Sequence, residues 1–337
     1  MITDQWYVIL DSREVKKNQV ISVKRMGENL VVWRDRQGRL GIAKDKCPHR
    51  GIALSKGKVK DDHLQCPFHG FEYDISGKCK RIPANGKANP VPDYIRASAF
   101  ATSEANGFIY LWWGDPARLG SARPTDLSPV KLPWFEDLDD KLVRSSFRAH
   151  WKAHYSRVIE NQLDVVHVPF IHHNTIGRGL GAVVNGPLTR ESDNSITFWP
   201  WNEKDEGQIP LRPDQISGPK NDSIYLTFVF PNLWQNHIMD ALRIVVAFVP
   251  VDDQNTLLYL RTYQKMVRLP VLKDIYAVMT NLFNRIVLRQ DQRVVETHQP
   301  MPSSLRMDEN LIQGDYPIIL YRKKRQELKQ NVTSPPS

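Results

Sequence analysis

The chain has 337 residues, of which 41% are hydrophobic and 25% are charged. Such a composition is typical of a folded globular protein with about two domains, and it excludes a chain that is largely disordered. The formal net charge of +9 would suit a protein that binds nucleic acid. However, the densest basic run, Arg322–Arg325 ("RKKR"), precedes the polar end "QNVTSPPS" and is expected to belong to a solvated or disordered tail. Nucleic acid is therefore not expected as a partner.

Neither export nor a membrane span is indicated. The N-terminal stretch "MITDQWYVILDSREVKK" lacks the basic start, apolar middle and cleavage site of a signal peptide. The most apolar long stretch, Leu269–Leu288, is interrupted by Lys273, Asp274 and Arg285, and we expect it to form a buried helix. Three cysteines cannot form a closed set of disulfides, so we expect metal ligands or free thiols in a cytoplasmic protein.

The first third of the chain predicts a small all-β domain. Short apolar runs are separated by turn signals such as Gln37-Gly38 and Ser76-Gly77. These runs are "LVVW", "GIA", "HLQCPFHGFEYD" and "FIYLWWG". The segment 114–133, "GDPARLGSARPTDLSPVKLP", is rich in proline and glycine and predicts a domain boundary. We place the first domain at residues 1–117.

The remaining chain predicts an α+β domain at residues 118–325, followed by a polar tail at 326–337. A helical stretch around 152–166 is followed by four strand-like runs and by a long helical pattern from about residue 272 to residue 297. The strand-like runs are "NSITFWPW", "SIYLTFVF", "LRIVVAFVP" and "TLLYLRTYQ". This order fits an antiparallel sheet with segregated helices.

Two of the three cysteines belong to a repeated motif that also contains histidine. Cys47 and His49 occur in "CPHRG", and Cys66 and His69 occur in "CPFHG". Two thiolates and two imidazoles could hold one structural zinc ion, although the spacing counts against it. One cysteine and one histidine in each half suit a two-iron cluster in which two cysteines hold one iron and two histidines hold the other. Neutral imidazoles raise the potential of such a cluster, so it accepts electrons from a ferredoxin or flavin donor.

These motifs resemble the signature of the Rieske non-haem iron oxygenases, and the resemblance covers roughly residues 5–315. It implies a Rieske [2Fe-2S] domain followed by a catalytic domain of the helix-grip, START-like type with a long C-terminal helix. The Rieske electron-transfer subunits of cytochrome complexes carry two further cysteines, where this chain has Ile52 and Phe68. This difference favours the oxygenase branch. Cys79 is expected to be a small core or surface residue.

Basic residues surround the two motifs, and two interpretations of them stay open. The residues are Lys56, Lys58, Lys60, Lys78, Lys80 and Arg81. They form either a solvated loop face or a surface that docks an acidic electron donor.

The second domain contains a candidate site for a single iron ion. In "ENQLDVVHVPFIHH", the pattern N-x2-D-x2-H-x4-H is formed by Asn161, Asp164, His167 and His172. Two histidines and one carboxylate are the ligands of an iron that activates oxygen and keeps open positions. On an ideal helix the two histidines would be separated by about 140°, so the chain must bend between them, and Pro169 is expected to cause the bend. The pattern resembles the iron motif of the Rieske oxygenases.

The neighbouring histidines are not expected to bind this iron. His150 and His154 are four residues apart and could chelate a metal from one helix face. They precede the family motif, so we expect structural or solvent-facing roles. His173 follows a candidate ligand directly and is expected to point away.

The resemblance places the third ligand far along the chain. The segment "LRQDQRVVETHQP" resembles the acidic part of the family's C-terminal helix and assigns the ligand to Asp291, with Glu296 as an alternative in the same stretch. In the family, the acid at the position of Asp164 lies between the Rieske histidine of one subunit and an iron-binding histidine of its neighbour. This role implies a homotrimer. Asn161 is expected to lie near the iron.

The resemblance implies an oxygenase subunit that receives electrons from NADH or NADPH through a ferredoxin or flavin reductase. Dioxygen would be activated at Fe(II) beside an aromatic or polycyclic substrate. A compact chain favours hydroxylation or demethylation; a ring-dihydroxylating dioxygenase and an electron carrier without oxygenase activity are the alternatives. Residues 224–230 and 244–248 are expected to line the pocket, with Trp199 and Trp201 as further candidates. The positive charge would suit an aromatic acid as substrate, although surface charge informs more on partners than on a pocket.

Overall fold

The computed structural model describes residues 1–119, 131–138 and 142–330, and these form two compact units, Met1–Leu132 and Pro133–Ser337. The division falls at the end of the segment rich in proline and glycine, later than the predicted 117/118 boundary. The predicted polar tail begins inside a helix, and its residues 331–337 lie outside the described residues.

The described residues of the N-terminal unit form strands and short 3-10 helices, which confirms the all-β prediction. One antiparallel sheet has the order β1 (Gln5–Asp11), β10 (Phe108–Trp113), β9 (Thr102–Ala105). A second has the order β2 (Gln19–Arg25), β3 (Glu28–Arg34), β4 (Leu40–Lys44). The third has the order β5 (Lys58–Lys60), β6 (His63–Gln65), β7 (Glu72–Tyr73), β8 (Cys79–Arg81). The 3-10 turns are η1 (Ser12–Glu14), η2 (Leu54–Lys56), η3 (Pro83–Asn85) and η4 (Pro116–Leu119).

Strand β3 is buried on both faces, which explains its unbroken apolar run. Successive side chains of a strand point to opposite faces. Accordingly, Leu30 and Val32 pack into one hydrophobic cluster, whereas Val31 packs into another cluster that also contains Cys47 and Cys66. The loops that carry the two cysteines are therefore attached to the core of this unit.

A seven-stranded antiparallel sheet dominates the C-terminal unit. Its order is β11 (Val143–Trp151), β19 (Asn255–Gln264), β18 (Leu242–Asp252), β17 (Leu233–Met239), β16 (Tyr225–Val229), β14 (Ser195–Trp199), β13 (Leu188–Glu191). Strands β12 (Val183–Val184) and β15 (Asn202–Glu203) form a separate ribbon. The helices and 3-10 turns are α1 (Tyr155–Leu163), α2 (Val168–Ile171), α3 (Pro270–Val295), α4 (Tyr316–Gln330), η5 (Pro213–Gln215) and η6 (Gln313–Asp315).

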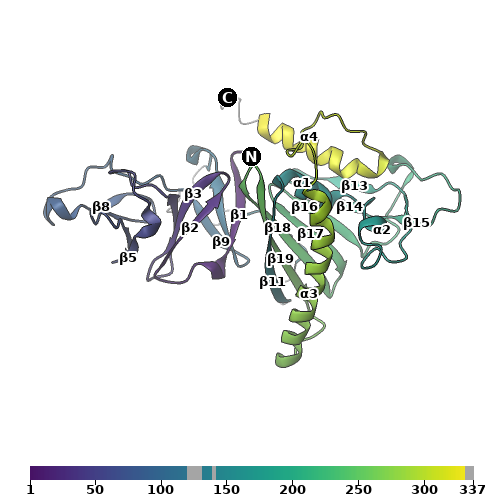
Figure 1. Cartoon of the computed structure of the whole chain (residues 1–337), viewed down its shortest axis with the longest axis horizontal. Helices are drawn as coiled ribbons and strands as arrows, with labels where there is room; N and C mark the ends of the chain where they lie inside the picture. The colour runs from purple at the N-terminus through teal and green to yellow at the C-terminus, as the bar shows by residue number, and fades with distance from the viewer. Residues whose placement is uncertain (120–130, 139–141, 331–337) are drawn as a thin grey trace. The chain divides into compact units, whose positions relative to one another are not determined.

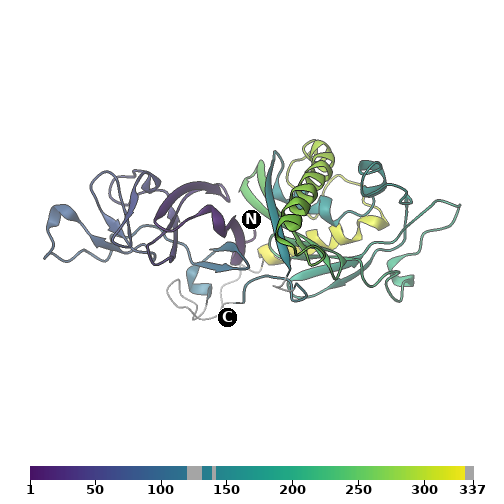
Figure 2. The same ribbon diagram turned by 90° about the horizontal axis from the view of Figure 1, so that it is seen from below.

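Helix α1 is the centre of this unit. It contacts strands β18 and β19 as well as helices α3 and α4. Helix α3 lies against β11 and β19 on one face of the sheet, as both views show (Figures 1 and 2). The predicted α+β architecture with a long C-terminal helix is thus confirmed.

Only part of α3 is buried. Its buried residues recur at intervals of three and four positions on one helix face: Asn284, Leu288, Asp291 and Val295. By contrast, Val271, Val278 and Leu282 are each more than 60% exposed. The predicted helix over Leu269–Leu288 is confirmed, but its predicted burial is wrong, because mainly the C-terminal half packs against the unit. No described helix is both long enough and apolar enough to span a bilayer.

Helix α4 contains the basic run that was expected to be solvated, and this expectation is wrong. Arg322 and Arg325 are buried, whereas Lys323 is exposed. Residues three positions apart share a helix face, so the helix turns both arginines inward. Arg322 binds both carboxylate oxygens of Glu160 in α1, at 2.8 and 2.9 Å.

Candidate metal sites

Two loops of the N-terminal unit carry the cysteine and histidine pairs, and both loops use the same backbone design. The N–H of Gly51 donates to the carbonyl of Cys47 at 2.8 Å, and the N–H of Gly70 donates to the carbonyl of Cys66 at 3.1 Å. Both glycines have positive φ, 76° and 72°, a region that glycine adopts without steric cost. The similarity of "CPHRG" and "CPFHG" therefore reflects one loop geometry used twice.

The loops place like side chains together. Cys47 and Cys66 are buried, and burial raises the pKa of the Cys66 thiol, with a further contribution from the thiol of Cys47. His49 and His69 are exposed, and their ring centroids are 4.8 Å apart. Two thiols on the buried side and two imidazoles on the solvent side fit a two-iron cluster held by one pair at each iron. They fit a single tetrahedral zinc ion less well.

Two residues that follow the second motif support these ligand pairs, and sequence reasoning missed both. The ring of Phe71 stacks on His49 with centroids 4.6 Å apart. The hydroxyl of Tyr73 lies 3.2 Å from Sγ of Cys47. Burial raises the pKa of Tyr73, so its hydroxyl keeps the proton and can donate to the sulfur. The available signal was the run "FEYD" directly after "CPFHG".

The basic residues around the loops divide into two groups. Three lie in ion pairs with acidic residues of the same unit: Lys60, Lys78 and Arg81. Three others are exposed: Lys56, Lys58 and Lys80. A docking role for the exposed group stays a prediction.

A second site forms where α1 ends and α2 begins. Helix α1 ends because Asp164 has extended geometry, with φ −86° and ψ 123°. Helix α2 has a single turn, and His167 and His172 flank it with ring centroids 5.3 Å apart. Pro169 lies in the first turn of α2, where its missing N–H is tolerated. The prediction that Pro169 bends the chain is therefore wrong, because the change of direction precedes His167.

Asp291 of α3 completes this group. Its Oδ1 lies 2.9 Å from Nε2 of His172 and 3.5 Å from Nε2 of His167. One ligand atom from each of the three residues lies within 4.8 Å of the other two. Oδ1 is buried yet forms no well-directed hydrogen bond, as expected when the three groups face one shared point. Two nitrogens and one carboxylate oxygen fit the ligand set of a non-haem Fe(II) with open positions.

The charges of this group also suit a cation. Burial raises the pKa of Asp291, but the imidazoles of His167 and His172 outweigh it and hold that pKa below its usual value. Burial lowers the pKa of His167, but the carboxylates of Asp164 and Asp291 outweigh it and raise that pKa to about 9. A proton on the imidazole of His167 and a metal ion therefore compete for the space between these three side chains.

Gln290 orients one of these histidines, and sequence reasoning missed it. Its Oε1 lies 2.8 Å from Nδ1 of His172 and also accepts from the hydroxyl of Thr175 at 2.8 Å. Its Nε2 donates to Asn174 at 2.7 Å. Because a carbonyl oxygen only accepts, Nδ1 of His172 carries the proton and Nε2 is left free for a metal.

Asp164 and Asn161 lie beside the group. Oδ1 of Asp164 accepts the backbone N–H groups of Val166 at 2.6 Å and His167 at 3.2 Å. Its Oδ2 lies 3.5 Å from Nδ1 of His167, too far for a strong hydrogen bond. Asn161 lines the chamber at the three residues, and its buried Nδ2 has no hydrogen-bond partner among the described residues.

The other candidates lie elsewhere. His150 and His173 are exposed, and His154 is a buried N-cap of α1 whose Nδ1 accepts from the N–H of Ser156. Glu296 ends α3, and its Oε1 accepts from the backbone N–H of Lys152 at 2.7 Å. Geometry thus favours Asp291 over Glu296 as the third residue of the group.

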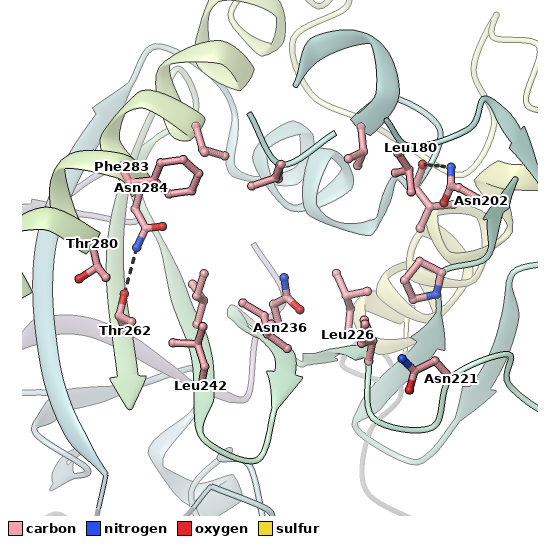
Figure 3. A pocket seen from close by; sticks show the side chains of 18 of the residues that line it. Leu180, Asn202, Asn221, Leu226, Asn236, Leu242, Thr262, Thr280, Phe283 and Asn284 are labelled. Atoms are coloured by element: carbon pink, nitrogen blue, oxygen red, sulfur yellow. Dashed lines mark hydrogen bonds between the residues drawn. The ribbon is translucent and has the colours of Figure 1, made fainter. Parts of the chain in front are cut away.

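A cavity of about 920 Å³ lies between α3 and the sheet (Figure 3). A chamber of about 130 Å³ lies at the metal-site residues. Alternate residues of the expected strands line the cavity, including Ile224, Leu226 and Ile244. Trp201 also lines the cavity. The ring of Trp199 packs instead against the guanidinium of Arg190, whose Cζ lies 4.9 Å from the ring centroid. Several residues line both spaces, so the cavity leads to the candidate iron site.

Two family models match the chain. The Rieske [2Fe-2S] domain matches residues 5–95, and the vanillate O-demethylase oxygenase C-terminal domain matches residues 151–331. The iron-sulfur subunit TsaM1 of the toluene-4-sulfonate monooxygenase system of Comamonas testosteroni is 27% identical over 206 residues, 60% of this chain and 56% of that protein. Chlorophyllide a oxygenase of Chlamydomonas reinhardtii is 31% identical over 175 residues, 52% of this chain and 25% of that protein. The chain thus spans little more than half of the one and a quarter of the other.

Solved structures share the fold along nearly the whole chain. NdmA of Pseudomonas putida CBB5 is 24% identical with a TM-score of 0.73, covering 97% of this chain and 90% of that chain. Dicamba monooxygenase bound to 3,6 dichlorosalicylic acid is 17% identical with a TM-score of 0.75, covering 99% of both chains. Because the C-terminal model alone matches more than half of the residues, the chain belongs to the Rieske oxygenases, a family that uses a [2Fe-2S] cluster, mononuclear iron, dioxygen and electrons from a reductase.

Proposed function

We propose that the chain is a Rieske monooxygenase that hydroxylates or demethylates a small organic ring compound. The convergence of His167, His172 and Asp291 at the inner end of a large cavity carries this proposal. An electron carrier needs no such group. Relatives named as monooxygenases, among them the TsaM1 system and dicamba monooxygenase, favour insertion of one oxygen atom over ring dihydroxylation.

The chain's residues divide between two cofactors. Cys47 and Cys66 would hold one iron of the cluster, and His49 and His69 would hold the other. His167, His172 and Asp291 would hold the mononuclear Fe(II). When bound, these groups supply one-electron transfer and dioxygen activation.

The protein groups around the cofactors have defined tasks. Tyr73 donates a hydrogen bond to Cys47, which stabilises added negative charge on the sulfur. Gln290 keeps His172 in the tautomer that binds a metal. The N–H₂ group of Asn161 has no partner in the described part of the chain and faces the chamber, where it can hold a water molecule or the substrate in place.

We further propose a homotrimer in which Asp164 connects the cluster of a neighbouring subunit with His167. Oδ2 of Asp164 lies 3.5 Å from the closest His167 nitrogen, and the side chain is 25% exposed. The carboxylate is therefore available to accept an N–H from outside the chain. The exposed apolar residues of α3 support contact between subunits. Sedimentation velocity tests the assembly, and the cytoplasmic location stays a prediction.

The Asp164 bridge is tested by the isosteric Asp164→Asn variant. Its cluster should still be reduced by a surrogate reductase, since none of the cluster-binding side chains is changed. Reoxidation of the cluster by dioxygen and substrate should be strongly slowed. An unchanged reoxidation rate, followed by stopped-flow absorbance, would rule out the bridge.

Iron content tests the oxygenase assignment. Protein reconstituted with iron and sulfide should contain about three iron ions per chain, two in the cluster and one at the second site. His172→Ala should keep the cluster, visible by electron paramagnetic resonance after reduction, and lose the additional ion. His173→Ala is the matched control, because His173 is exposed, and it should retain all the iron. Wild-type protein with only the two cluster irons would show that the chain is a carrier.

A further inference from the structure

The size of the cavity limits the compounds that would use it fully. Its volume of about 920 Å³ is about six times that of a roughly 150 Å³ apolar cavity that holds one benzene ring. A single-ring compound would leave most of this space filled with water or empty. Binding sites for small molecules enclose most of the ligand surface, so the volume favours several fused rings.

Among the described residues, the lining of the cavity offers no unpaired cation. Most lining side chains are apolar, and the charged ones are Asp164 and Lys220. The ammonium of Lys220 is paired with Glu203 at 2.7 Å and lies 5.2 Å from the ring centroid of Trp201. Transfer of an anion into such surroundings without a counter-charge is costly. A carboxylate would also face the negative charge of Asp164.

Two amides stand where the cavity meets the inner chamber. Asn236 of β17 and Asn284 of α3 line both spaces. The side chain of Asn236 points into the open centre of the cavity (Figure 3) and makes no hydrogen bond to any described residue. Asn284 is 8% exposed, and its Nδ2 donates to the hydroxyl of Thr262 at 3.0 Å. Its Oδ1 accepts no hydrogen bond from a described residue. Asn236 is half-buried, so its amide is open to a ligand that enters the cavity and can donate to it and accept from it.

We infer that the site takes an uncharged compound of several fused rings, oriented by Asn236 and Asn284 through a neutral polar group such as a carbonyl, hydroxyl or amide. That this compound is the substrate rests on the proposed function. The binding preference itself does not, because it can be measured without turnover. The inferred compound is uncharged, unlike the aromatic acid that the positive net charge of the chain would suit. Each asparagine amide provides an N–H₂ donor and a carbonyl acceptor, which can pair with a neutral polar group of the ligand. Binding of such a group does not require an ion to leave water.

Four probes separate ring number from charge. Anthracene-9-carboxamide and anthracene-9-carboxylate have nearly the same shape and differ in charge, and benzamide and benzoate form the matching one-ring pair. Equilibrium dialysis against the iron-loaded protein should show that anthracene-9-carboxamide binds at least about tenfold more tightly than each of the other three. The same order is expected with His172→Ala, which removes direct binding of a carboxylate to iron. Tighter or equal binding of anthracene-9-carboxylate in both proteins, or failure of all four probes to bind, would overturn the inference.

Variants of the amides locate the binding. Asn236→Leu should weaken anthracene-9-carboxamide by about tenfold, since one hydrogen bond is lost. Asn236→Asp has the same shape and should weaken it as well without improving the carboxylate, so the test does not depend on how leucine packs. Asn194→Leu is the control, because Asn194 is exposed and is not among the residues that line the cavity. If wild type and both Asn236 variants bound anthracene-9-carboxamide with equal affinity, Asn236 would not contact the ligand. Failure of the oxygenase assignment would appear as missing iron, with the binding order unchanged.

Discussion

Replacing Arg322 with methionine should destabilise the C-terminal unit because it breaks a buried ion cluster. Arg322 binds both oxygens of Glu160, at 2.8 and 2.9 Å, and one oxygen of Glu309 at 2.8 Å. Arg157 contacts the same two carboxylates, at 3.1 and 2.7 Å. The side chains of Arg322 and Glu160 are 3% and 7% exposed, so water screens their interaction little.

The expected loss follows from these contacts. Three charge-assisted hydrogen bonds at about 1.5–3 kcal/mol each set an upper range of roughly 5–9 kcal/mol. Arg157 remains to pair both carboxylates in the variant, and Glu309 is 24% exposed and therefore partly hydrated. The loss should then approach the ~3–5 kcal/mol typical of removing one partner from a buried ion pair.

Calorimetry of the iron-loaded protein measures this effect. For a unit of about 200 residues, 3–5 kcal/mol corresponds to a fall in Tm of roughly 10 °C. Lys323→Met changes the neighbouring, exposed residue and should leave Tm nearly unchanged. If the two variants melted within about 2 °C of each other, the burial of Arg322 would not stabilise the protein and the argument would fail.

Three further predictions concern the sites and the pH dependence of stability. Gln290→Leu should weaken retention of the mononuclear iron about 10- to 100-fold against a chelator, because Nδ1 of His172 loses its acceptor. Tyr73→Phe should lower the reduction potential of the cluster by roughly 40 mV in a redox titration, the equivalent of one hydrogen bond to Cys47 of about 1 kcal/mol. Burial and the charge of Arg325 lower the pKa of His154 to about 3, so below about pH 6.5 the unfolded chain binds a proton that the folded chain does not. The free energy of unfolding should therefore fall by about 1 kcal/mol more between pH 6.5 and 5.5 in wild type than in His154→Asn.

Each of these predictions has a matched control on an exposed residue. Arg289→Gln should retain iron, Tyr94→Phe should keep the potential, and His150→Asn should keep the wild-type pH dependence. Gln290→Leu with wild-type iron retention would mean that the tautomer of His172 is held by other groups. A cluster potential unchanged in Tyr73→Phe would mean that the hydroxyl does not donate to the sulfur. Parallel pH profiles for wild type and His154→Asn would place the pKa of His154 near its ordinary value.

Local patterns predicted much of the fold. The central strands β18 and β19 are rich in β-branched and aromatic residues, which favour strands in any surroundings. Strand β11, "VRSSFRAHW", was missed because its alternation is weak and its residues are largely polar. Its strand structure comes from pairing with β19, more than 100 residues away in the chain. Pairing over that distance leaves no mark in a short window of sequence.

At the candidate iron site, too, local patterns can identify some residues, whereas contacts between distant parts of the chain cannot be predicted from them. The choice between Asp291 and Glu296 could have been made from helical periodicity, because Asp291 shares a face with Leu288 and Asn284 whereas Glu296 ends the helix. Gln290 could not have been found in this way. Its partner His172 lies 118 positions earlier, and adjacent residues of a helix point in different directions.

Helix α1 connects the buried ion cluster around Arg322 with the candidate iron site. Consecutive residues of α1 serve the two: Glu160 binds Arg322 of α4, and Asn161 lines the chamber at the iron ligands. Asp164 ends the same helix and positions the backbone of His167. Through α1, the ion pair with Arg322 of α4 is thus connected to the backbone of His167, one of the candidate iron ligands. We therefore expect that loosening the Arg322–Glu160 pair also disturbs the position of His167 relative to Asp291.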